Sequence, residues 1–514
     1  MTDHHCDLLV IGAGASGASV AYEAVRRGLK VALLEAGDIA GGTSSRSTKL
    51  LHGGVRYLEL AFKTMDLAQL QLVREALLER GHWLRAAPFL AHRLELALPT
   101  QSWFEQAYYG LGLGLYDRLS GSTGLGRSRR LSGEDLIAAL PRLCRSQGGV
   151  AYSDGQFDDA RLNLLLALTA EHAGVQLRSR CRVIGFERNG AGRLTAAVSE
   201  TRAGLQERWQ AQAIVNTTGI HADAVRCMAD PSAPPRLLTS RGTHLVLNDN
   251  LCPQGMGLLV PATDDGRVLF MLPFFGRTLV GTTDEPCGPS EAASPTDDEE
   301  AYLLRYVRQW FPGEQEPAVS SRWAGGRPLL QPNGGERNSS QVVREHEVET
   351  LPCGLVSLMG GKWTTCRPMA LDCLAAVERQ LPAPLPKPRS LPLLGAATTP
   401  EQTMAGLHRQ AMALEALLPD IPERAHQIRH LQHNFGLRAE ALVAHAPMEA
   451  RAPLSPVIPI CRAEIRHAIQ EEHATSASDV LSRRCRLAMV DTAEAERLRP
   501  LVHEELNHER DVKP

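Results

Sequence analysis

Hydrophobic and polar positions in the first 35 residues follow the order strand, helix, strand. Residues 7–11 form a short apolar run that is typical of a buried strand, and residues 15–27 have a helical periodicity that ends at Gly28. Residues 30–34 form a second apolar run. The pattern therefore predicts a β-α-β unit that begins almost at the first residue.

The middle of the chain mixes helical and alternating patterns. Short alternating runs separated by turn glycines dominate residues 236–285 and predict an antiparallel sheet. Another alternating run, at residues 207–216, leads into Thr217, Thr218 and Gly219. Helical periodicity is expected at three other places, residues 58–85, 162–172 and 299–311. These patterns together predict a mixed α/β chain.

Proline density and a return of helical periodicity mark the last quarter of the chain. Residues 381–400 carry six prolines, a density that prevents a helix and predicts a semi-rigid linker. Helical periodicity follows at residues 401–418, 422–435, 462–472 and 477–508. We therefore expect a separate all-helical C-terminal domain.

Composition excludes several classes of protein. The chain has 514 residues, 43% of them hydrophobic and 22% charged, and a formal net charge of −3, so nucleic acid is not an expected partner. Eleven cysteines occur without a Cys-x-x-Cys spacing, which favours buried thiols over a disulfide framework or a metal site. No signal-peptide core precedes Asp7, and no uninterrupted apolar run reaches the roughly 18 residues of a spanning helix. We expect a cytoplasmic protein.

A glycine-rich loop stands between the first predicted strand and the first predicted helix. Gly12, Gly14 and Gly17 have the Gly-x-Gly-x-x-Gly spacing, and Glu35 follows the second strand. The first glycine permits a tight turn, the second lets the backbone approach a pyrophosphate, and the third allows the helix to pack closely on the strand. The helix N-terminus offers N–H groups to phosphates, and Glu35 can accept hydrogen bonds from ribose hydroxyls. This context predicts a dinucleotide site.

Two features favour FAD over NAD, which the loop alone does not separate. The motif lies at the start of this sequence, and about 200 residues later a predicted strand ends at Thr218 and Gly219, where it can close over the dinucleotide. A second credible fingerprint is missing, because the Gly-Leu repeat at residues 110–114 does not follow an alternating strand. One tightly bound FAD is the simplest interpretation.

The segment at residues 41–59 closely resembles the second flavin-binding segment of FAD-dependent glycerol-3-phosphate dehydrogenases of the aerobic, quinone-linked type. It reads GGTSSRSTKLLHGGVRYLE. Further matches follow in order along nearly the whole chain, at residues 152–154, 158–162, 242–244, 281–284, 326–329, 360–365 and 479–487. Thr217 departs from the family pattern, which usually has alanine there, and Cys366 stands where the family has tyrosine.

The resemblance implies a three-part α/β architecture. It consists of a Rossmann-like FAD-binding domain, an antiparallel-sheet substrate domain and an all-helical C-terminal domain. We divide the chain accordingly into a discontinuous FAD-binding domain (1–80, 146–235 and 320–380), a substrate-binding domain (81–145 and 236–319), the Pro-rich linker (381–400) and the C-terminal domain (401–514).

The resemblance also implies glycerol 3-phosphate as the substrate, and a phosphate dianion requires fixed positive charge. Arg56, Arg327 and Lys362 lie beside glycines that permit close backbone approach, and they are our candidates for phosphate binding. Arg344 is a fourth candidate. Tyr57 is expected to hold the hydroxyl or the phosphate.

Oxidation of the central hydroxyl also requires a proton acceptor. His244 is the leading base because histidine titrates in the useful range, and Arg327 and Lys362 complete the expected catalytic set. Lys362 can in addition stabilise negative charge on reduced flavin. Beyond the glycine loop, Glu35, Thr218 and Gly219, the expected cofactor contacts are Thr43, Ser44, Ser45, Lys49, His52, Gly53, Gly361, Lys362 and Thr364.

The function that the resemblance implies is oxidation of sn-glycerol 3-phosphate to dihydroxyacetone phosphate, with a hydride passing to FAD and electrons passing on to a quinone. A glycerol-3-phosphate oxidase that uses O₂, a flavin amine oxidase-like enzyme and a non-catalytic FAD-binding module remain as alternatives. The quinone acceptor would place the protein peripherally on the inner face of a membrane. A homodimer is left open.

Overall fold

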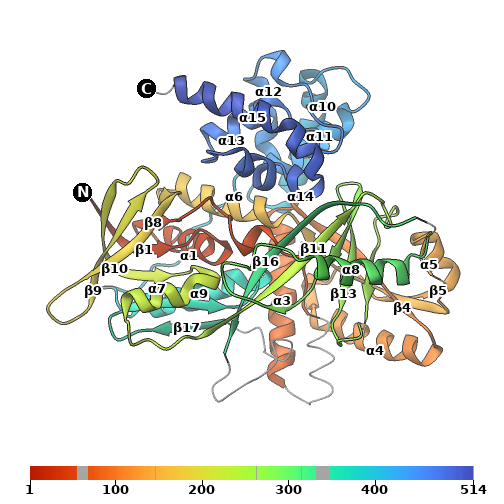
Figure 1. Cartoon of the computed structure of the whole chain (residues 1–514), viewed down its shortest axis with the longest axis horizontal. Coiled ribbons are helices and arrows are strands. Elements are labelled where there is room, and N and C mark those ends of the chain that lie inside the picture. The colour runs from red at the N-terminus through yellow and green to blue at the C-terminus, as the bar shows by residue number, and fades with distance from the viewer. Residues whose placement is uncertain (55–66, 145, 262, 314, 332–345, 513–514) are drawn as a thin grey trace.

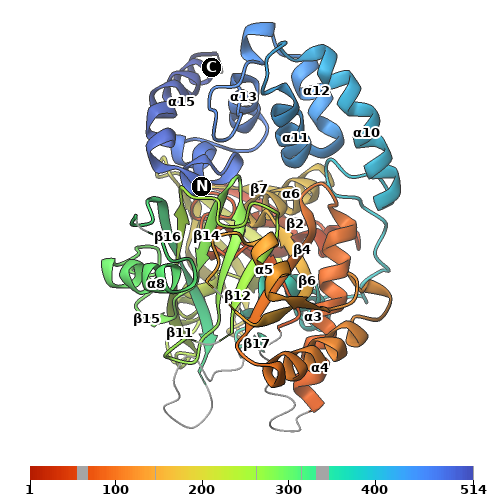
Figure 2. The ribbon, with the colours of Figure 1, turned by 90° about the vertical axis from the view of Figure 1, so that its right-hand side faces the viewer.

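Two sheets and a helical domain make up the fold. The computed structural model describes residues 1–54, 67–144, 146–261, 263–313, 315–331 and 346–512. The two sheets lie beside each other, and the C-terminal helices cover the same end of both (Figure 1, Figure 2). The predicted fold class is confirmed.

The first sheet has eight strands and a parallel centre. Its path runs through β17 (His346–Thr350), β18 (Leu355–Gly360), β10 (Gln206–Asn216), β1 (Thr2–Ile11), β2 (Val31–Leu34) and β7 (Gln176–Arg178), while β8 (Cys181–Arg188) and β9 (Leu194–Thr201) continue from β10. β1 pairs in parallel with both β2 and β10, and α1 (Ala15–Val25) joins β1 to β2. The predicted β-α-β unit is therefore present. α1, α6 (Asp159–His172) and α9 (Cys366–Glu378) contribute to one apolar core beside this sheet.

The second sheet has ten strands and is mainly antiparallel. Its path runs through β15 (Glu285–Pro286), β11 (Leu237–Leu247), β14 (Arg277–Gly281), β13 (Leu269–Phe274), β12 (Gly257–Val260), β4 (Ala91–Thr100), β6 (Gly148–Phe157) and β3 (Leu50–Leu51), with β16 (Val319–Leu330) on β11 and β5 (Arg129–Ser132) on β6. The helices that flank it are α3 (Leu67–Ala86), α4 (Trp103–Leu119), α5 (Gly133–Ala139) and α8 (Asp297–Trp310). The antiparallel sheet predicted for residues 236–285 is confirmed by the pairing of β11, β13 and β14.

Two strands that begin near expected domain boundaries lie in the second sheet. β6 and β16, which the division at residues 146 and 320 assigns to the FAD-binding domain, both lie in the second sheet. β6 pairs with β4 along its whole length, and β16 pairs with β11 from Leu330 to Val319. Each strand is joined to its sheet by partners that are distant in sequence, which periodicity alone does not show.

The Pro-rich segment contains no helix between residues 382 and 399, as its proline density predicts. It is nevertheless bonded to the first half of the molecule. The Tyr22 hydroxyl donates to the Leu391 carbonyl, and the Leu394 N–H donates to Thr169 Oγ1 at 3.0 Å. Leu393 is buried in the apolar core beside α1 and α6. The segment is thus packed against the rest of the molecule and leads to Pro400, where α10 begins.

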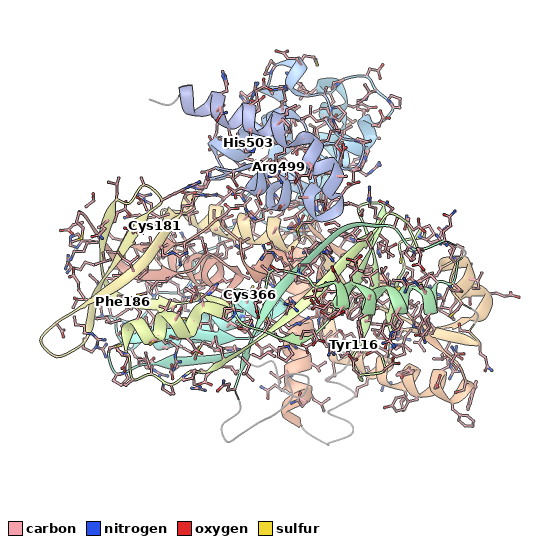
Figure 3. All side chains as sticks on the ribbon, viewed as in Figure 1. Tyr116, Cys181, Phe186, Cys366, Arg499 and His503 are labelled. Atoms are coloured by element: carbon pink, nitrogen blue, oxygen red, sulfur yellow. The ribbon has the colours of Figure 1, made fainter. Side chains whose placement is uncertain are left out.

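The C-terminal domain is helical, as predicted. Its elements are α10 (Pro400–Leu417), α11 (Arg424–Phe435), α12 (Ala439–Ala444), α13 (Arg462–Gln470), a π-helical turn (Asp479–Arg484), α14 (Leu487–Val490) and α15 (Thr492–Val512). Buried ion pairs fix it to α6 and to the loop after β2: Arg161 with Glu472, and Arg484 with Asp38. Arg499 and His503 mark α15 at the outer end of the molecule in Figure 3. Among the described residues, no helix is long and apolar enough to cross a membrane.

Candidate active site

A cavity of about 920 Å³ lies where the carboxyl ends of β1, β2 and β10 approach β11 and β16 of the second sheet. Ligands of open parallel sheets bind at such strand ends. The cavity brings together thirteen of the residues singled out from the sequence. They are Gly12, Gly14, Glu35, Thr43, Ser44, His52, Thr218, Gly219, His244, Arg327, Gly361, Lys362 and Thr364.

The glycine loop has the backbone geometry that its spacing predicts. Gly12 has φ +101°, a conformation that favours glycine, and a Cβ on Gly17 would overlap the Gly12 carbonyl oxygen. Gly14 precedes α1 without a side-chain cap, and the Ala15 N–H donates to Ser44 Oγ at 2.8 Å. Helix N–H groups and a hydroxyl therefore converge at the cavity edge, which suits a pyrophosphate.

Glu35 is held in place by two backbone donors. Its carboxylate oxygens accept from the Ala13 N–H at 2.8 Å and the Gly37 N–H at 2.7 Å. Burial raises the pKa of Glu35, and the two N–H bonds work in the opposite direction. The side chain lines the cavity, so its remaining lone pairs can accept from a ribose.

Thr217, the departure from the family pattern, ties the end of β10 to the glycine loop. Its hydroxyl lies 2.8 Å from the Ile11 carbonyl oxygen and 3.0 Å from the Gly12 carbonyl oxygen. The extra hydroxyl is thus satisfied within the protein.

Lys49 does not line the cavity. Lys49 is buried, and its Nζ donates to the Asp159 carboxylate at 2.7 Å and to the Ser45 carbonyl at 2.8 Å. Arg486 of the C-terminal domain donates to the same carbonyl at 2.9 Å. The buried ammonium is stabilised by this carboxylate, and it supports the loop from within the protein.

Three other expected cofactor contacts also lie outside the cavity lining, namely Gly17, Ser45 and Gly53. Gly17 packs against Gly12, and the Gly53 N–H donates to the Tyr116 hydroxyl at 2.7 Å. Their role in the described part of the chain is to shape the loops. Arg56, Tyr57 and Arg344 lie outside the described residues.

His244 is buried at the cavity wall. Its Nε2 lies 2.9 Å from Thr48 Oγ1, and its ring stacks on Trp323 with centroids 4.3 Å apart. Burial, followed by the positive charges of Lys49 and Arg327, lowers the pKa of His244 well below 6.5. The imidazole is therefore neutral at physiological pH and able to accept a proton.

The side chain of Arg327 lies against Gly242 of β11. Its guanidinium donates to Thr282 Oγ1 and the Thr283 carbonyl, each at 3.0 Å, and a Cβ on Gly242 would overlap it. A Cβ on Gly281 would likewise overlap the His244 ring. Two glycines thus make room for the two functional side chains. Lys362 lines the same cavity from the turn after β18.

Arg46 is a functional candidate that the sequence reasoning missed. It lines the cavity, and its guanidinium has no hydrogen bond or ion pair among the described residues. Burial lowers the pKa of Arg46, and the nearby charges of Arg483 and Arg486 lower it further. A cation in this environment favours an anionic ligand. Its position in a loop of small hydroxyl residues was the available signal.

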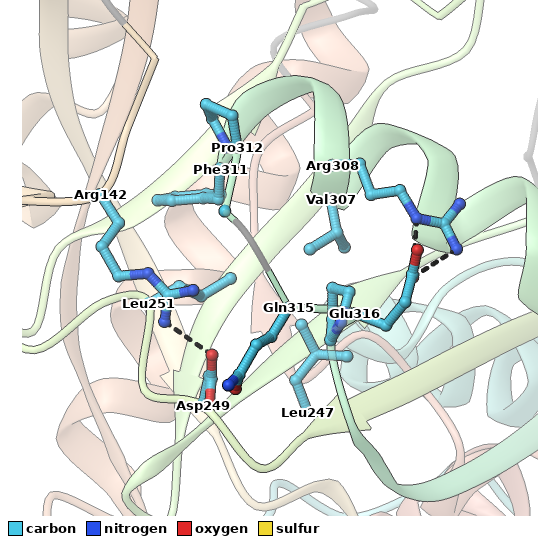
Figure 4. A pocket seen from close by; sticks show the side chains of 12 residues that line it. Arg142, Leu247, Asp249, Leu251, Val307, Arg308, Phe311, Pro312, Gln315 and Glu316 are labelled. Atoms are coloured by element: carbon cyan, nitrogen blue, oxygen red, sulfur yellow. Dashed lines mark hydrogen bonds and ion pairs between the residues drawn. The ribbon is translucent and has the colours of Figure 1, made fainter.

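A second hollow, of about 170 Å³, is a poorer site (Figure 4). Its two arginines pair with carboxylates, Arg142 with Asp249 at 2.6 Å and Arg308 with Glu316 at 2.7 Å, but Arg327 of the larger cavity likewise lies 3.3 Å from Asp284, so ion pairing does not separate the two sites. None of the residues predicted from the sequence lines it. The larger cavity is therefore the candidate active site, and its glycine loop, carboxylate, hydroxyls and Arg46 fit FAD.

Comparison with known proteins agrees with this fold. Residues 7–366 match the family described as FAD dependent oxidoreductase, and residues 387–513 match the C-terminal domain of alpha-glycerophosphate oxidase. The fold and the site thus define an FAD-dependent oxidoreductase.

Proteins of similar sequence identify the family within that class. The mitochondrial glycerol-3-phosphate dehydrogenase SDP6 of Arabidopsis thaliana is 37% identical over 96% of this chain and 81% of its own length. The human mitochondrial glycerol-3-phosphate dehydrogenase is 35% identical over 98% of this chain and 70% of its own. The FAD complex of the glycerol-3-phosphate dehydrogenase from Bacillus halodurans has a similar fold, with a TM-score of 0.75 at 24% identity over 98% of this chain and 91% of that one. The chain belongs to the FAD-dependent glycerol-3-phosphate dehydrogenase family, and its cofactor is FAD.

Proposed function

We propose that the protein oxidises sn-glycerol 3-phosphate to dihydroxyacetone phosphate and passes the electrons to a quinone. The observation that supports this most strongly is the convergence of Arg327, Lys362 and His244 on the cavity that the dinucleotide loop also lines. Two cations meet the needs of a phosphate dianion, and a neutral imidazole meets those of a hydroxyl proton.

In the proposed reaction the C–H bond of the central carbon and the O–H bond of its hydroxyl break, and the second bond of the C=O group forms. Arg327 and Lys362 bind the phosphate and hold the central carbon in one orientation. His244 accepts the proton of the central hydroxyl as the C=O bond forms. Bound FAD supplies the hydride acceptor. Arg56, Tyr57 and Arg344 remain part of the proposed substrate site on the basis of their positions in the sequence.

The negative charge of the substrate phosphate would raise the basicity of His244, the proposed base. In the substrate-free protein, burial and two neighbouring cations keep the pKa of His244 well below 6.5. A phosphate dianion neutralises part of that positive charge, so substrate binding raises the basicity of the imidazole. Arg327 would therefore both bind the substrate and help to prepare the proton acceptor.

The electron acceptor distinguishes the quinone-linked enzyme from an oxidase. The L-alpha-glycerophosphate oxidase of Mycoplasma pneumoniae has a related fold, with a TM-score of 0.57 at 18% identity over 76% of this chain and 98% of that one. Fold alone does not separate the two activities. We expect one dihydroxyacetone phosphate per quinone analogue reduced, with faster turnover than in oxygen. Stoichiometric peroxide with slow quinone reduction would assign an oxidase, and a missing ketone product would contradict the proposed reaction.

A further inference from the structure

Trp323 of β16 lies directly opposite His244 of β11 in the second sheet. Side chains of directly opposed residues lie on the same face of a sheet, where they can contact each other. Here the indole and the imidazole stack, with ring centroids 4.3 Å apart and an angle of 20° between the ring planes. Trp323 is buried and does not line the cavity, so it does not itself contact a substrate bound there.

Two further contacts confine the imidazole of His244. On β14, at the other edge of β11, its partner is Gly281, and a Cβ there would lie 2.2 Å from His244 Cδ2. In front of the ring, Thr48 lines the cavity, and its Oγ1 lies 2.9 Å from His244 Nε2. The ring plane and the direction of its nitrogens are therefore set by Trp323, Gly281 and Thr48 together.

The C-terminal domain holds Trp323 in place. Trp323 Nε1 donates to the Met489 carbonyl of α14 at 3.3 Å, and Ser321 Oγ, two positions earlier on β16, donates to the Ala488 carbonyl at 3.0 Å. The last C=O groups of a helix have no partner within the helix, and these two accept from the strand instead. Helix α14 thus lies against β16, as Figure 1 shows, and fixes the position of the indole.

A buried cation contacts the same indole. Lys49 Nζ lies 4.5 Å from the centroid of the Trp323 ring and is paired with Asp159. Attraction between a cation and the face of a Trp ring stabilises such a contact. Burial is the largest cause of the low pKa of His244, and the charge of Lys49 is the next. Because Trp323 contacts both side chains, it keeps this charge at a fixed distance from the imidazole.

We propose that Trp323 is a positioning residue for the proton acceptor: its indole fixes the plane of the His244 imidazole. The inference rests on the proposed function, in which His244 accepts the proton of the central hydroxyl. The torsion that rotates a histidine ring about its Cβ–Cγ bond has only a broad preference of its own, so a flat neighbouring ring is needed to fix it. Rotation would move the ring nitrogens out of hydrogen-bond reach of the substrate, and a displacement of about 1 Å can slow a reaction about 100-fold.

Anaerobic flavin reduction by sn-glycerol 3-phosphate in the FAD-loaded protein tests this role. Trp323→Leu removes the flat ring, and its reduction rate at saturating substrate should fall roughly 10-fold or more. The substrate concentration for half-saturation should change by less than about twofold, because Arg327 and Lys362 bind the phosphate. Trp323→Phe keeps a flat ring and should restore most of the rate. A Phe variant as slow as the Leu variant would overturn the proposal, as would a Leu variant as fast as the wild type.

A double-mutant cycle separates positioning from general damage to the protein. His244→Gln removes the proton acceptor, which typically slows a reaction about 100-fold or more. In that background the ring has no imidazole to orient, so Trp323→Leu should slow flavin reduction by no more than about twofold further. Equal slowing by Trp323→Leu in the two backgrounds would overturn the proposal. Trp323→Met, a larger side chain without a ring, takes the place of Trp323→Leu in every comparison if the Leu variant does not retain FAD.

Trp209 offers a matched control. It is buried in the first sheet, and its ring stacks on His4 with centroids 4.0 Å apart. Neither Trp209 nor His4 lines the cavity. Trp209→Leu therefore removes an indole of the same size from a similar stack, and flavin reduction is expected to stay within about twofold of the wild-type rate. A loss as large as that of Trp323→Leu would attribute the effect to the removal of any buried indole and would overturn the proposal.

Failure of the positioning role and failure of the proposed function are distinguishable. A wild-type flavin that sn-glycerol 3-phosphate does not bleach would contradict the proposed reaction, and a His244→Gln protein reduced as fast as the wild type would contradict the proposed base. In either case the positioning role falls with it. A slow His244→Gln protein together with a fast Trp323→Leu protein would contradict only the role of Trp323.

Discussion

Replacing Arg46 by glutamine should separate the binding of FAD from the folding of the protein. The guanidinium lines the cavity without a partner among the described residues, and Arg483 and Arg486 add positive charge nearby. Removal of Arg46 therefore relieves repulsion in the apoprotein. The same change removes a cation that an anionic cofactor would meet. We predict weaker FAD binding together with an apoprotein that is as stable as the wild type or more so.

The size of the effect follows from the charge and burial of the site. A hydrogen bond to a charged group contributes about 1.5 to 3 kcal/mol, which corresponds to a loss of roughly 10-fold to 150-fold in affinity. A guanidinium and a phosphate about 4 Å apart at an effective dielectric constant of about 20 interact by about 4 kcal/mol, which sets an upper bound.

Titration of apoprotein with FAD, followed by quenching of flavin fluorescence, measures the dissociation constant, and thermal unfolding of the apoprotein measures stability. Arg322→Gln is the matched control, since Arg322 is exposed and pairs with Asp297 and Glu300 away from the cavity. The control should keep the wild-type dissociation constant. An Arg46→Gln protein that binds FAD within twofold of the wild type would refute the electrostatic role of this residue. A less stable apoprotein would refute the repulsion among the three arginines.

Three further substitutions test other parts of the site and fold. Gly17→Ala should prevent tight FAD binding, because its Cβ would overlap the Gly12 carbonyl oxygen. Gly110→Ala is the control and should leave FAD binding unchanged, because a Cβ at Gly110 of α4 would meet no atom within 4 Å. Equal FAD affinity of the two variants would contradict the packing of the loop. Arg327→Met should raise the KM for glycerol 3-phosphate by roughly 10-fold or more through loss of a charged contact, and an unchanged KM in steady-state assays would remove Arg327 from the phosphate site. Burial lowers the pKa of His433 from 6.5 to about 4, so the stability that the neutral ring confers is complete above pH 6.5 and is lost as the pH falls to 4, by up to about 3 kcal/mol. Urea unfolding at pH 7 and pH 4.5 should show a smaller acid-induced loss for His433→Gln than for the wild type, and equal losses would contradict this assignment.

Local patterns in the sequence were sufficient for the elements that depend on neighbouring residues. The β-α-β unit at the N-terminus, the antiparallel runs at residues 236–285 and the C-terminal helices each have a periodicity that burial on one or both faces imposes. The conformation of Gly12 also followed from its place in a tight turn.

Strand pairing and side-chain direction depend on residues that are distant in sequence, so local patterns did not predict them. β6 is buried at every position and β16 has no regular alternation of buried and exposed positions, and only their pairing with β4 and β11 assigns them to the second sheet. Lys49 lies in a loop of hydroxyl residues that suits a cofactor, but Asp159, 110 residues away, holds its ammonium in a buried ion pair. Arg46, three positions earlier, was missed although it faces the cavity. Side-chain direction within an irregular loop is set by such tertiary contacts.

Anaerobic reduction of the bound flavin tests the central claim, that a cationic cavity beside FAD selects a phosphorylated three-carbon alcohol. The loss of visible flavin absorbance after mixing with sn-glycerol 3-phosphate or with glycerol, at equal concentrations, is the quantity to measure. We predict rapid and complete bleaching by sn-glycerol 3-phosphate and negligible bleaching by glycerol, because glycerol offers no anion to Arg327 and Lys362. Equal rates with the two alcohols, or no bleaching with either, would contradict the account.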